Sequence, residues 1–343
     1  MSNKPKKGPT WAAATSDPFE AAPPFFGPDT FADNAFGKPA PYDGPLLKGS
    51  YGYVAPDFLR DTYGGGQLES VPGYYPDIAM LDGINGNTTT RIAQPVDPGV
   101  SPAFKGNPTA KLESAYERDD RVQVNITTSV PWRAICHLII SRQSGVTVTG
   151  TGWFAASDVV VTAGHNYLHH TQGGYATRIR IIPAANGQYG APFGEVEPFK
   201  IFAHPRWIQD ADPEYDYALI RLPTTEFGRR TGWFGFANAS MEFLNGALLN
   251  LAGYPYDKPF GTLWYHAGRA RVVNERFIAY RLDTEGGQSG APIFYFREGR
   301  RQVLAMHTQG DPTLNKSKWN SGIRVTGEFY NDLLKAIGFS NNQ

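Results

Sequence analysis

Residues 283–294 of the chain read DTEGGQSGAPIF, which places Ser289 in a glycine-rich turn that leads into an apolar run. A serine hydroxyl is a poor nucleophile until a neutral imidazole accepts its proton. Glycines before such a serine let the backbone direct several N–H groups at one point, where they can stabilise an oxyanion. The turn therefore indicates acyl-transfer chemistry, with Ser289 as nucleophile and the amides of Gly287 and Ser289 as oxyanion hole.

Two further segments supply the partners that this serine needs. His165 ends the run VVVTAGH at residues 159–165, and Asp216 stands directly before the strand-like run YALIRL at residues 217–222. A carboxylate on one imidazole nitrogen fixes the tautomer whose other nitrogen can take the serine proton. The chain order His165, Asp216, Ser289 therefore predicts a catalytic triad.

Two other kinds of site, an α/β-hydrolase nucleophile elbow and a zinc site, fit the sequence less well. An α/β-hydrolase nucleophile elbow requires Gly-Xaa-Ser-Xaa-Gly opening a helix, whereas residue 291 is Ala and the next residues favour a strand. His165 and His169 have the spacing of a zinc-binding pair, but no Glu adjoins His165 and no acidic cluster is nearby. We expect His169 and His170 to be a surface pair at the end of a short helical turn, and no metal or organic cofactor is indicated.

From about residue 120 the sequence alternates short apolar runs with turns, which is typical of an all-β barrel or sandwich. The expected strands are residues 121–126, 134–140, 157–162, 178–182, 217–222, 248–251, 277–282, 291–296 and 302–306. One helix is expected near the C-terminus, because Phe329, Leu333 and Ile337 recur at helical spacing. Thr326 can cap its start and Gly338 can end it.

Residues 1–113 differ in composition from the rest of the chain. They hold more than half of the 27 prolines, mixed with glycine and aromatic residues, and show no sustained helical or alternating period. We predict that residues 1–113 form a loop-rich segment, which could be a propeptide, a wrapping arm or a docking arm for a partner. Its aromatic residues indicate that it packs on a surface. Residues 114–343 are then the catalytic domain.

Composition narrows the class of protein further. The formal net charge is +0 from 32 basic and 32 acidic residues, which gives no electrostatic case for nucleic acid or an anionic membrane. No apolar run approaches the length of a membrane span, and no signal peptide is visible, so we expect a cytoplasmic protein or a non-Sec export route, with secretion as the alternative. The single cysteine, Cys136, lies in an apolar run and is expected to be a small core residue.

The chain resembles the glutamyl endopeptidases of the staphylococcal V8 protease type. The resemblance starts at Asp120 and rests on five segments in the family's order, of which GYPYDKP at residues 253–259 and GGQSGAP at residues 286–292 are the most specific. It implies a chymotrypsin-like double β-barrel with the triad in the cleft between the barrels. It also implies cleavage after Glu, less readily after Asp, with Thr284 and His307 binding the substrate's P1 carboxylate.

The same resemblance implies a free amine near the pocket, which by position would arise at Ser114. Because Glu113 precedes Ser114, we hypothesise self-cleavage at this bond. Gln288 stands where trypsin-type zymogens have the Asp that pairs with a new N-terminus, so that switch is absent. The predicted function is a serine endopeptidase. The alternative is a structural or regulatory protein whose N-terminal segment docks a partner while the protease domain is blocked or silent.

Overall fold

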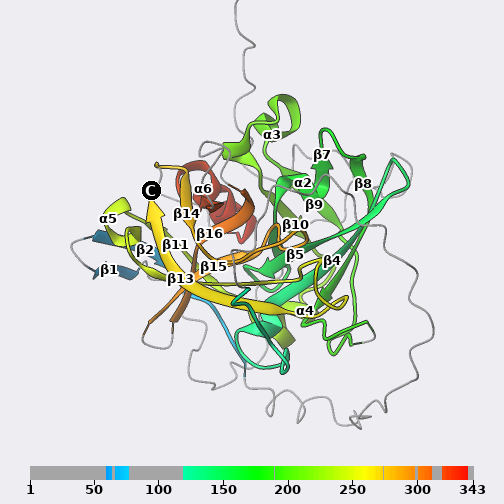
Figure 1. The fold of residues 1–343 in the computed structure, drawn as a ribbon, viewed down its shortest axis with the longest axis horizontal. Coiled ribbons are helices and arrows are strands. Elements are labelled where there is room, and N and C mark those ends of the chain that lie inside the picture. The colour runs from blue at the N-terminus through cyan, green and yellow to red at the C-terminus, as the bar shows by residue number, and fades with distance from the viewer. Residues whose placement is uncertain are drawn as a thin grey trace, which may run out of the picture.

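The computed structural model describes residues 59–63, 66–76, 119–188, 190–272, 274–297, 300–310 and 319–338. These residues form two curled β-sheets with few helices (Figure 1). The prediction of an all-β fold made of two barrel-like sheets is confirmed. No helix among the described residues is long and apolar enough to cross a membrane.

The first sheet has seven strands in the order β7-β8-β4-β5-β6-β10-β9. Its strands are β4 (Ile135–Arg142), β5 (Thr147–Phe154), β6 (Val159–Thr162), β7 (Leu168–His169), β8 (Gly174–Pro183), β9 (Lys200–Ala203) and β10 (Ala218–Arg221). All four residues of β6 are buried, as expected for a β-branched run in a barrel wall. Strands β6 and β10 are antiparallel with Thr162 opposite Ala218. The chain therefore leaves β6 toward His165 at the same end at which Asp216 precedes β10.

The second sheet has ten strands, of which nine follow the order β1-β2-β11-β16-β15-β12-β13-β14-β17, while β3 pairs with β13. Its strands are β1 (Leu59–Tyr63), β2 (Gly66–Val71), β3 (Val122–Gln123), β11 (Gly235–Ala239), β12 (Leu248–Gly253), β13 (Trp264–Val272), β14 (Phe277–Tyr280), β15 (Pro292–Arg297), β16 (Arg300–Gly310) and β17 (Asn320–Arg324). Strands β15 and β16 are antiparallel with Pro292 opposite Met306. The turn that carries Ser289 therefore lies beside His307.

Part of the N-terminal segment, which was predicted to be loop-rich, forms two strands of the second sheet that the sequence did not predict. Strands β1 and β2 form an antiparallel hairpin, and β2 pairs with β11 from Phe236 opposite Val71 to Ala239 opposite Leu68. Beyond β2, Tyr74 forms a bridge with Trp233. Apart from residues 59–63 and 66–76, the segment 1–113 lies outside the described residues, as does the Glu113–Ser114 bond.

The helices are α2 (Gly164–Tyr167), α3 (Pro205–Asp210), α4 (Glu226–Thr231), α5 (Met241–Leu244) and α6 (Gly327–Ala336), with 3-10 turns at Trp132–Ala134 and Pro213–Tyr215. Helix α6 confirms the predicted C-terminal helix, and Gly338 follows it with a φ of 82°. Thr326 occupies the N-cap position, but its side chain forms no capping hydrogen bond. The helix contacts both sheets. Phe329 stacks on Tyr217, next to β10, with ring centroids 4.3 Å apart, and the Tyr330 ring lies 5.7 Å from that of Phe236 in β11.

Several predicted strands differ in extent from those observed. The run 121–126 forms only the two-residue strand β3, which pairs with Trp264 and Tyr265 at the start of β13. Val124 still donates to the Leu263 carbonyl, and the chain bends at Asn125. Cys136 lies fully buried in β4, and burial raises the pKa of its thiol well above the ordinary value. Its expected place as a core residue is thus confirmed.

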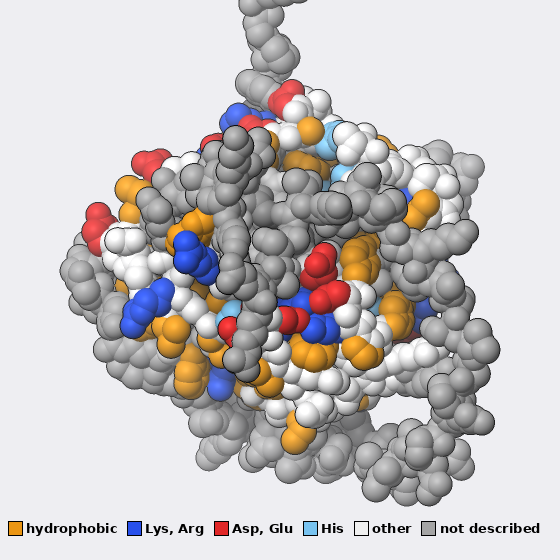
Figure 2. Space-filling model, in the orientation of Figure 1, with side chains coloured by type: hydrophobic (Ala, Val, Ile, Leu, Met, Phe, Trp, Pro, Cys, Tyr) orange, Lys and Arg blue, Asp and Glu red, His pale blue; other side chains and the backbone are white. Residues whose placement is uncertain are grey.

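On the face drawn in Figure 2, the described acidic and basic side chains are interspersed rather than gathered by sign.

Candidate active site

His165 is held at the first turn after β6. The turn is tight because Gly164 approaches Trp207 and Asp216, so that a Cβ atom at position 164 would lie 2.9 Å from Trp207 Cδ1 and 3.0 Å from Asp216 Oδ1. A larger residue than glycine would displace one of these neighbours. The small residues before His165 therefore bring its imidazole against the carboxylate.

Asp216 binds His165 through both of its carboxylate oxygens. Oδ1 accepts a hydrogen bond from the His165 backbone N–H at 2.7 Å, and Oδ2 lies 2.7 Å from His165 Nδ1. Asp216 is 3% exposed, so water competes little for these bonds. A carboxylate accepts only, which places the proton of a neutral His165 on Nδ1 and leaves Nε2 able to take a proton.

Ser289 lies in a turn bounded by two glycines with positive φ, Gly287 at +94° and Gly290 at +90°. A Cβ atom at Gly287 would lie 2.4 Å from the carbonyl oxygen of Tyr254. One at Gly290 would lie 2.1 Å from the carbonyl oxygen of Thr151. Both positions therefore require glycine for backbone conformation and for space, and Gly290 packs the turn directly on β5 of the first sheet.

Asn166, which the sequence did not single out, connects the Ser289 turn to the His165 turn. Its side-chain nitrogen donates to the carbonyl oxygen of Ser289 at 3.0 Å and to Thr162 Oγ1 at 2.9 Å. The Ser289 carbonyl also accepts from the Thr151 N–H at 2.9 Å. Asn166 fits because residue 150 is glycine, where a Cβ atom would lie 2.5 Å from Asn166 Nδ2. Ser289 itself is 7% exposed.

Replacing Asn166 by Ala is expected to lower kcat by about tenfold or more, because small displacements of reacting groups have large effects on rate. The variant removes one of two hydrogen bonds to the Ser289 carbonyl and should also unfold at a lower temperature. Peptidase assays and thermal unfolding check this. Asn186→Ala is the matched control, since its amide binds the Asn125 carbonyl in an exposed position. Unchanged kcat in Asn166→Ala would contradict the prediction.

Thr284 and His307 are both fully buried in the second barrel. The Tyr280 hydroxyl donates to the Ser321 carbonyl at 2.7 Å, so its oxygen accepts from His307 Nδ1 at 2.6 Å. This network assigns the proton of a neutral His307 to Nδ1. Thr284 Oγ1 has no hydrogen-bond partner among the described residues, nor has Thr308 Oγ1, next to His307. Such buried polar atoms are suited to binding a polar group of a ligand.

His169 and His170 differ from the expected surface pair. His169 lies in β7 and is partly buried, with its ring centroid 5.8 Å from that of His165. Burial, followed by the nearby His165, lowers the pKa of His169 to about 4. His170 is exposed, and its Nε2 lies 2.7 Å from the Trp207 carbonyl oxygen. In the described part of the chain no group of three or more His, Cys, Asp or Glu side chains could hold a metal ion.

Comparison with known proteins places the chain in a family. A trypsin-like peptidase domain matches residues 150–306. A glutamyl endopeptidase of Bacillus licheniformis is 33% identical over 227 residues, which cover 65% of this chain and 68% of that protein. The chain belongs to the glutamyl endopeptidase group of chymotrypsin-fold serine peptidases.

Two further proteins are similar to this chain. A Bacillus subtilis protein named extracellular metalloprotease is 30% identical over 227 residues, covering 66% of this chain and 70% of that protein. A solved structure of a Glu endopeptidase superposes on this chain with a TM-score of 0.57 at 21% identity. The superposition covers 65% of this chain and 98% of that one, and it supports the fold. The prediction that this protein is a chymotrypsin-like serine endopeptidase is confirmed.

Proposed function

We propose that the peptidase cleaves peptide bonds with Ser289 as nucleophile, His165 as general base and acid, and Asp216 as the group that orients His165. The observation that carries the proposal is the pair of 2.7 Å contacts between Asp216 and His165, in a turn whose next residue, Asn166, binds Ser289. The Ser289 hydroxyl itself donates to the Thr308 carbonyl oxygen at 3.4 Å, and in the proposed reaction it gives its proton to His165 Nε2 instead.

The proposed reaction follows acyl transfer through two tetrahedral intermediates. His165 takes the Ser289 proton as the oxygen attacks the substrate carbonyl, then gives it to the leaving amine. Asp216 stabilises the imidazolium that forms between these steps. The amides of Gly287 and Ser289 would donate to the oxyanion, and one such donor typically contributes about 10²–10³ to the rate. In the second half of the reaction His165 takes a proton from water, the water oxygen attacks the acyl group, and His165 returns the proton to the leaving Ser289 oxygen.

We propose further that the substrate residue before the cut is Glu, and less readily Asp. The unsatisfied Thr284 hydroxyl and the buried His307 imidazole support a pocket for a carboxylate. Because a neutral His307 carries its proton on Nδ1, its Nε2 can donate to a carboxylate only when the ring is doubly protonated. The B. licheniformis relative is itself named a glutamyl endopeptidase.

A peptide library with every residue at P1 tests the specificity. Wild-type protein is expected to cut after Glu far more often than after Gln, and His307→Ala to lose that preference while retaining Ser289-dependent cleavage. Calorimetric titration of Ser289→Ala should show tighter binding of a peptide ending in Glu than of the same peptide ending in Gln. A Glu preference that survives in His307→Ala would remove His307 from the pocket. No cleavage by any form would favour a binding protein with a silent protease domain.

A further inference from the structure

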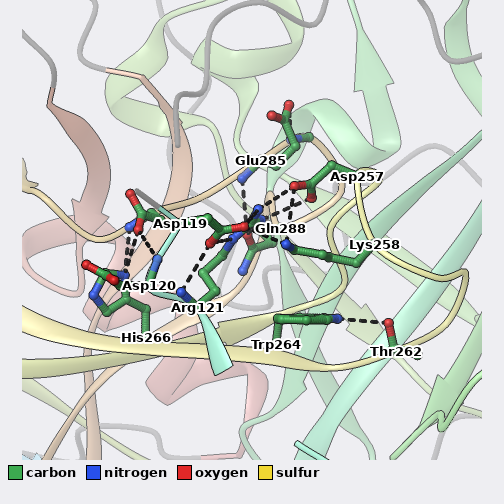
Figure 3. Close-up of polar contacts among 12 residues, drawn as sticks. Asp119, Asp120, Arg121, Asp257, Lys258, Thr262, Trp264, His266, Glu285 and Gln288 are labelled. Atoms are coloured by element: carbon green, nitrogen blue, oxygen red, sulfur yellow. Dashed lines mark hydrogen bonds and ion pairs between the residues drawn. The ribbon is translucent and has the colours of Figure 1, made fainter. Parts of the chain in front are cut away.

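The residues before β3 lie beside the turn that carries Ser289 (Figure 3). The Arg121 guanidinium, whose side chain is 0% exposed, donates from Nη1 to Gln288 Oε1 at 3.3 Å. The same group binds Asp119 Oδ1 through Nε and Asp119 Oδ2 through Nη2, both at 2.9 Å. Nη1 also donates to Asp257 Oδ1 at 3.1 Å. A buried cation therefore contacts the residue that precedes Ser289.

Gln288 transmits this contact to the backbone of the turn. Its side chain is fully buried, and Oε1 also accepts a hydrogen bond from the Glu285 N–H at 3.1 Å. Both neighbours of this atom are donors, which assigns the amide oxygen to that side. The Gln288 side chain is thus held between Arg121 and Glu285, and it fixes the path of residues 285–288, which includes Gly287.

The neighbouring residue, Asp120, binds the other end of the same loop. Its backbone N–H donates to Asp283 Oδ2 at 2.9 Å, and Asp283 is 1% exposed. The Asp283 N–H in turn donates to His266 Nδ1 at 2.9 Å. Asp120 and Arg121 therefore hold both ends of the loop 283–288, which contains Thr284 of the proposed pocket and Gly287 of the proposed oxyanion hole.

The charges around Arg121 keep its guanidinium in place. A buried cation is costly unless its donors are satisfied, and here Asp119 and Asp257 accept from it while remaining 28% and 36% exposed. Burial alone would lower the pKa of Arg121, but hydrogen bonds to Asp119 and Asp257 outweigh it and raise that pKa. Hydrogen bonding from Arg121 holds the pKa of Asp119 well below its usual range. A second cation lies beside these carboxylates, since Lys258 Nζ is 2.5 Å from Asp119 Oδ2.

We propose that Arg121 is a positioning residue for the peptidase reaction. Its guanidinium acts through Gln288 to hold the loop 283–288 in the conformation in which Gly287 and Ser289 meet the substrate. This inference rests on the proposed function. The position before the nucleophile is neutral here, and the cation that anchors it comes from a side chain of the same chain.

Kinetics of Arg121→Met, Gln288→Met and the double variant test the proposal. We expect each single variant to lower kcat about a hundredfold, because the loop is displaced from the reacting atoms while KM changes less. The double variant should be little worse than either single one, since both remove the same contact. Arg121→Lys should recover part of kcat, because an ammonium can still donate to Gln288. Arg180→Met is the matched control, since Arg180 pairs with Glu195 on the exposed face of β8.

Two results would overturn the proposal: a folded Arg121→Met with wild-type kcat, or losses that multiply in the double variant. Near-UV circular dichroism at the assay temperature confirms that each variant is folded. The rate at which a fluorophosphonate labels Ser289, with loss of fluoride, provides a readout that does not need a peptide substrate. If wild-type protein cuts no peptide, the proposed function fails, whereas slower labelling in Arg121→Met would still support the positioning role, and unchanged labelling would contradict it.

Discussion

Ser289→Ala is expected to lower kcat by about 10⁶-fold and Asp216→Asn by about 10⁴-fold, the losses found when members of such a triad are removed. In Asp216→Asn the amide oxygen can still accept from the His165 backbone N–H, which turns the amide NH₂ group toward His165 Nδ1. The imidazole must then carry its proton on Nε2, where it can no longer accept the Ser289 proton. The fold should be retained, because the replacement is nearly isosteric.

The comparison requires a matched change outside the site. Asp158→Asn is suitable because Asp158 is also a partly buried acid, and it pairs at 2.8 Å with Arg221 at the opposite end of β10 from Asp216. Peptide cleavage rates and near-UV circular dichroism of the variants provide the measurement. If Asp216→Asn retained more than a tenth of wild-type kcat while Asp158→Asn behaved as wild type, Asp216 would not be the residue that orients His165.

The residues of the proposed site could be singled out from the sequence because they lie in short local patterns. The strand before His165, the acid before β10 and the glycines around Ser289 each carry their own signal, and β6 and β10 pair so that the first two meet. The residues that contact the turns of the proposed site carried no such signal. Asn166 binds a residue 123 positions away and Arg121 binds one 167 positions away. Such pairs become visible only in the folded chain.

The N-terminal hairpin was missed for a different reason. Strand β2 reads GQLESV, which lacks sustained alternation of apolar and polar residues, and its neighbours are rich in glycine and proline. Its pairing is set by the available edge of β11 rather than by its own pattern. Composition therefore described most of this segment as loop, while the tertiary partner determines the strand.

A protein that begins at Ser114 is expected to be much less stable than one that begins at Leu59. Truncation at Ser114 removes β2 from the edge of β11. It also removes the buried Val71, which is 5% exposed, and leaves the surface against which Val71 packs open to water. Burial of one such side chain contributes about 2 kcal/mol. Domains are stable by only about 5–15 kcal/mol in total, so losing this side chain and a four-residue ladder is a large part of the whole.

Contacts beyond β2 increase the expected loss. Tyr74 and Trp233 exchange two backbone hydrogen bonds, and the buried Arg133 guanidinium donates to the carbonyl oxygen of Pro76. Without residues 66–76 this guanidinium loses an acceptor inside the protein, which is unfavourable for a charged group. Thermal unfolding of proteins comprising residues 59–343 and 114–343 measures the difference. We expect the shorter protein to melt at least 10 °C lower, since about 1 kcal/mol shifts the midpoint by a few degrees in domains of this size.

A single substitution in the full-length chain tests whether the lower stability comes from losing the contact between β2 and β11 or from shortening the chain. Gly73→Val should reproduce much of the destabilisation, because a Cβ atom there would lie 2.4 Å from the backbone nitrogen of Gly235. Gly145→Ala is the control for glycine replacement, since nothing lies within 4 Å of its Cβ position. Although Gly145 has a φ of +81°, replacing it brings no clash with β11. Equal melting temperatures for the proteins beginning at Leu59 and Ser114, with Gly73→Val unchanged, would show that the hairpin is dispensable. The expected result instead makes β2 and the residues up to Pro76 an integral part of the second barrel. A cut at Glu113–Ser114 would then leave them bound without a covalent link.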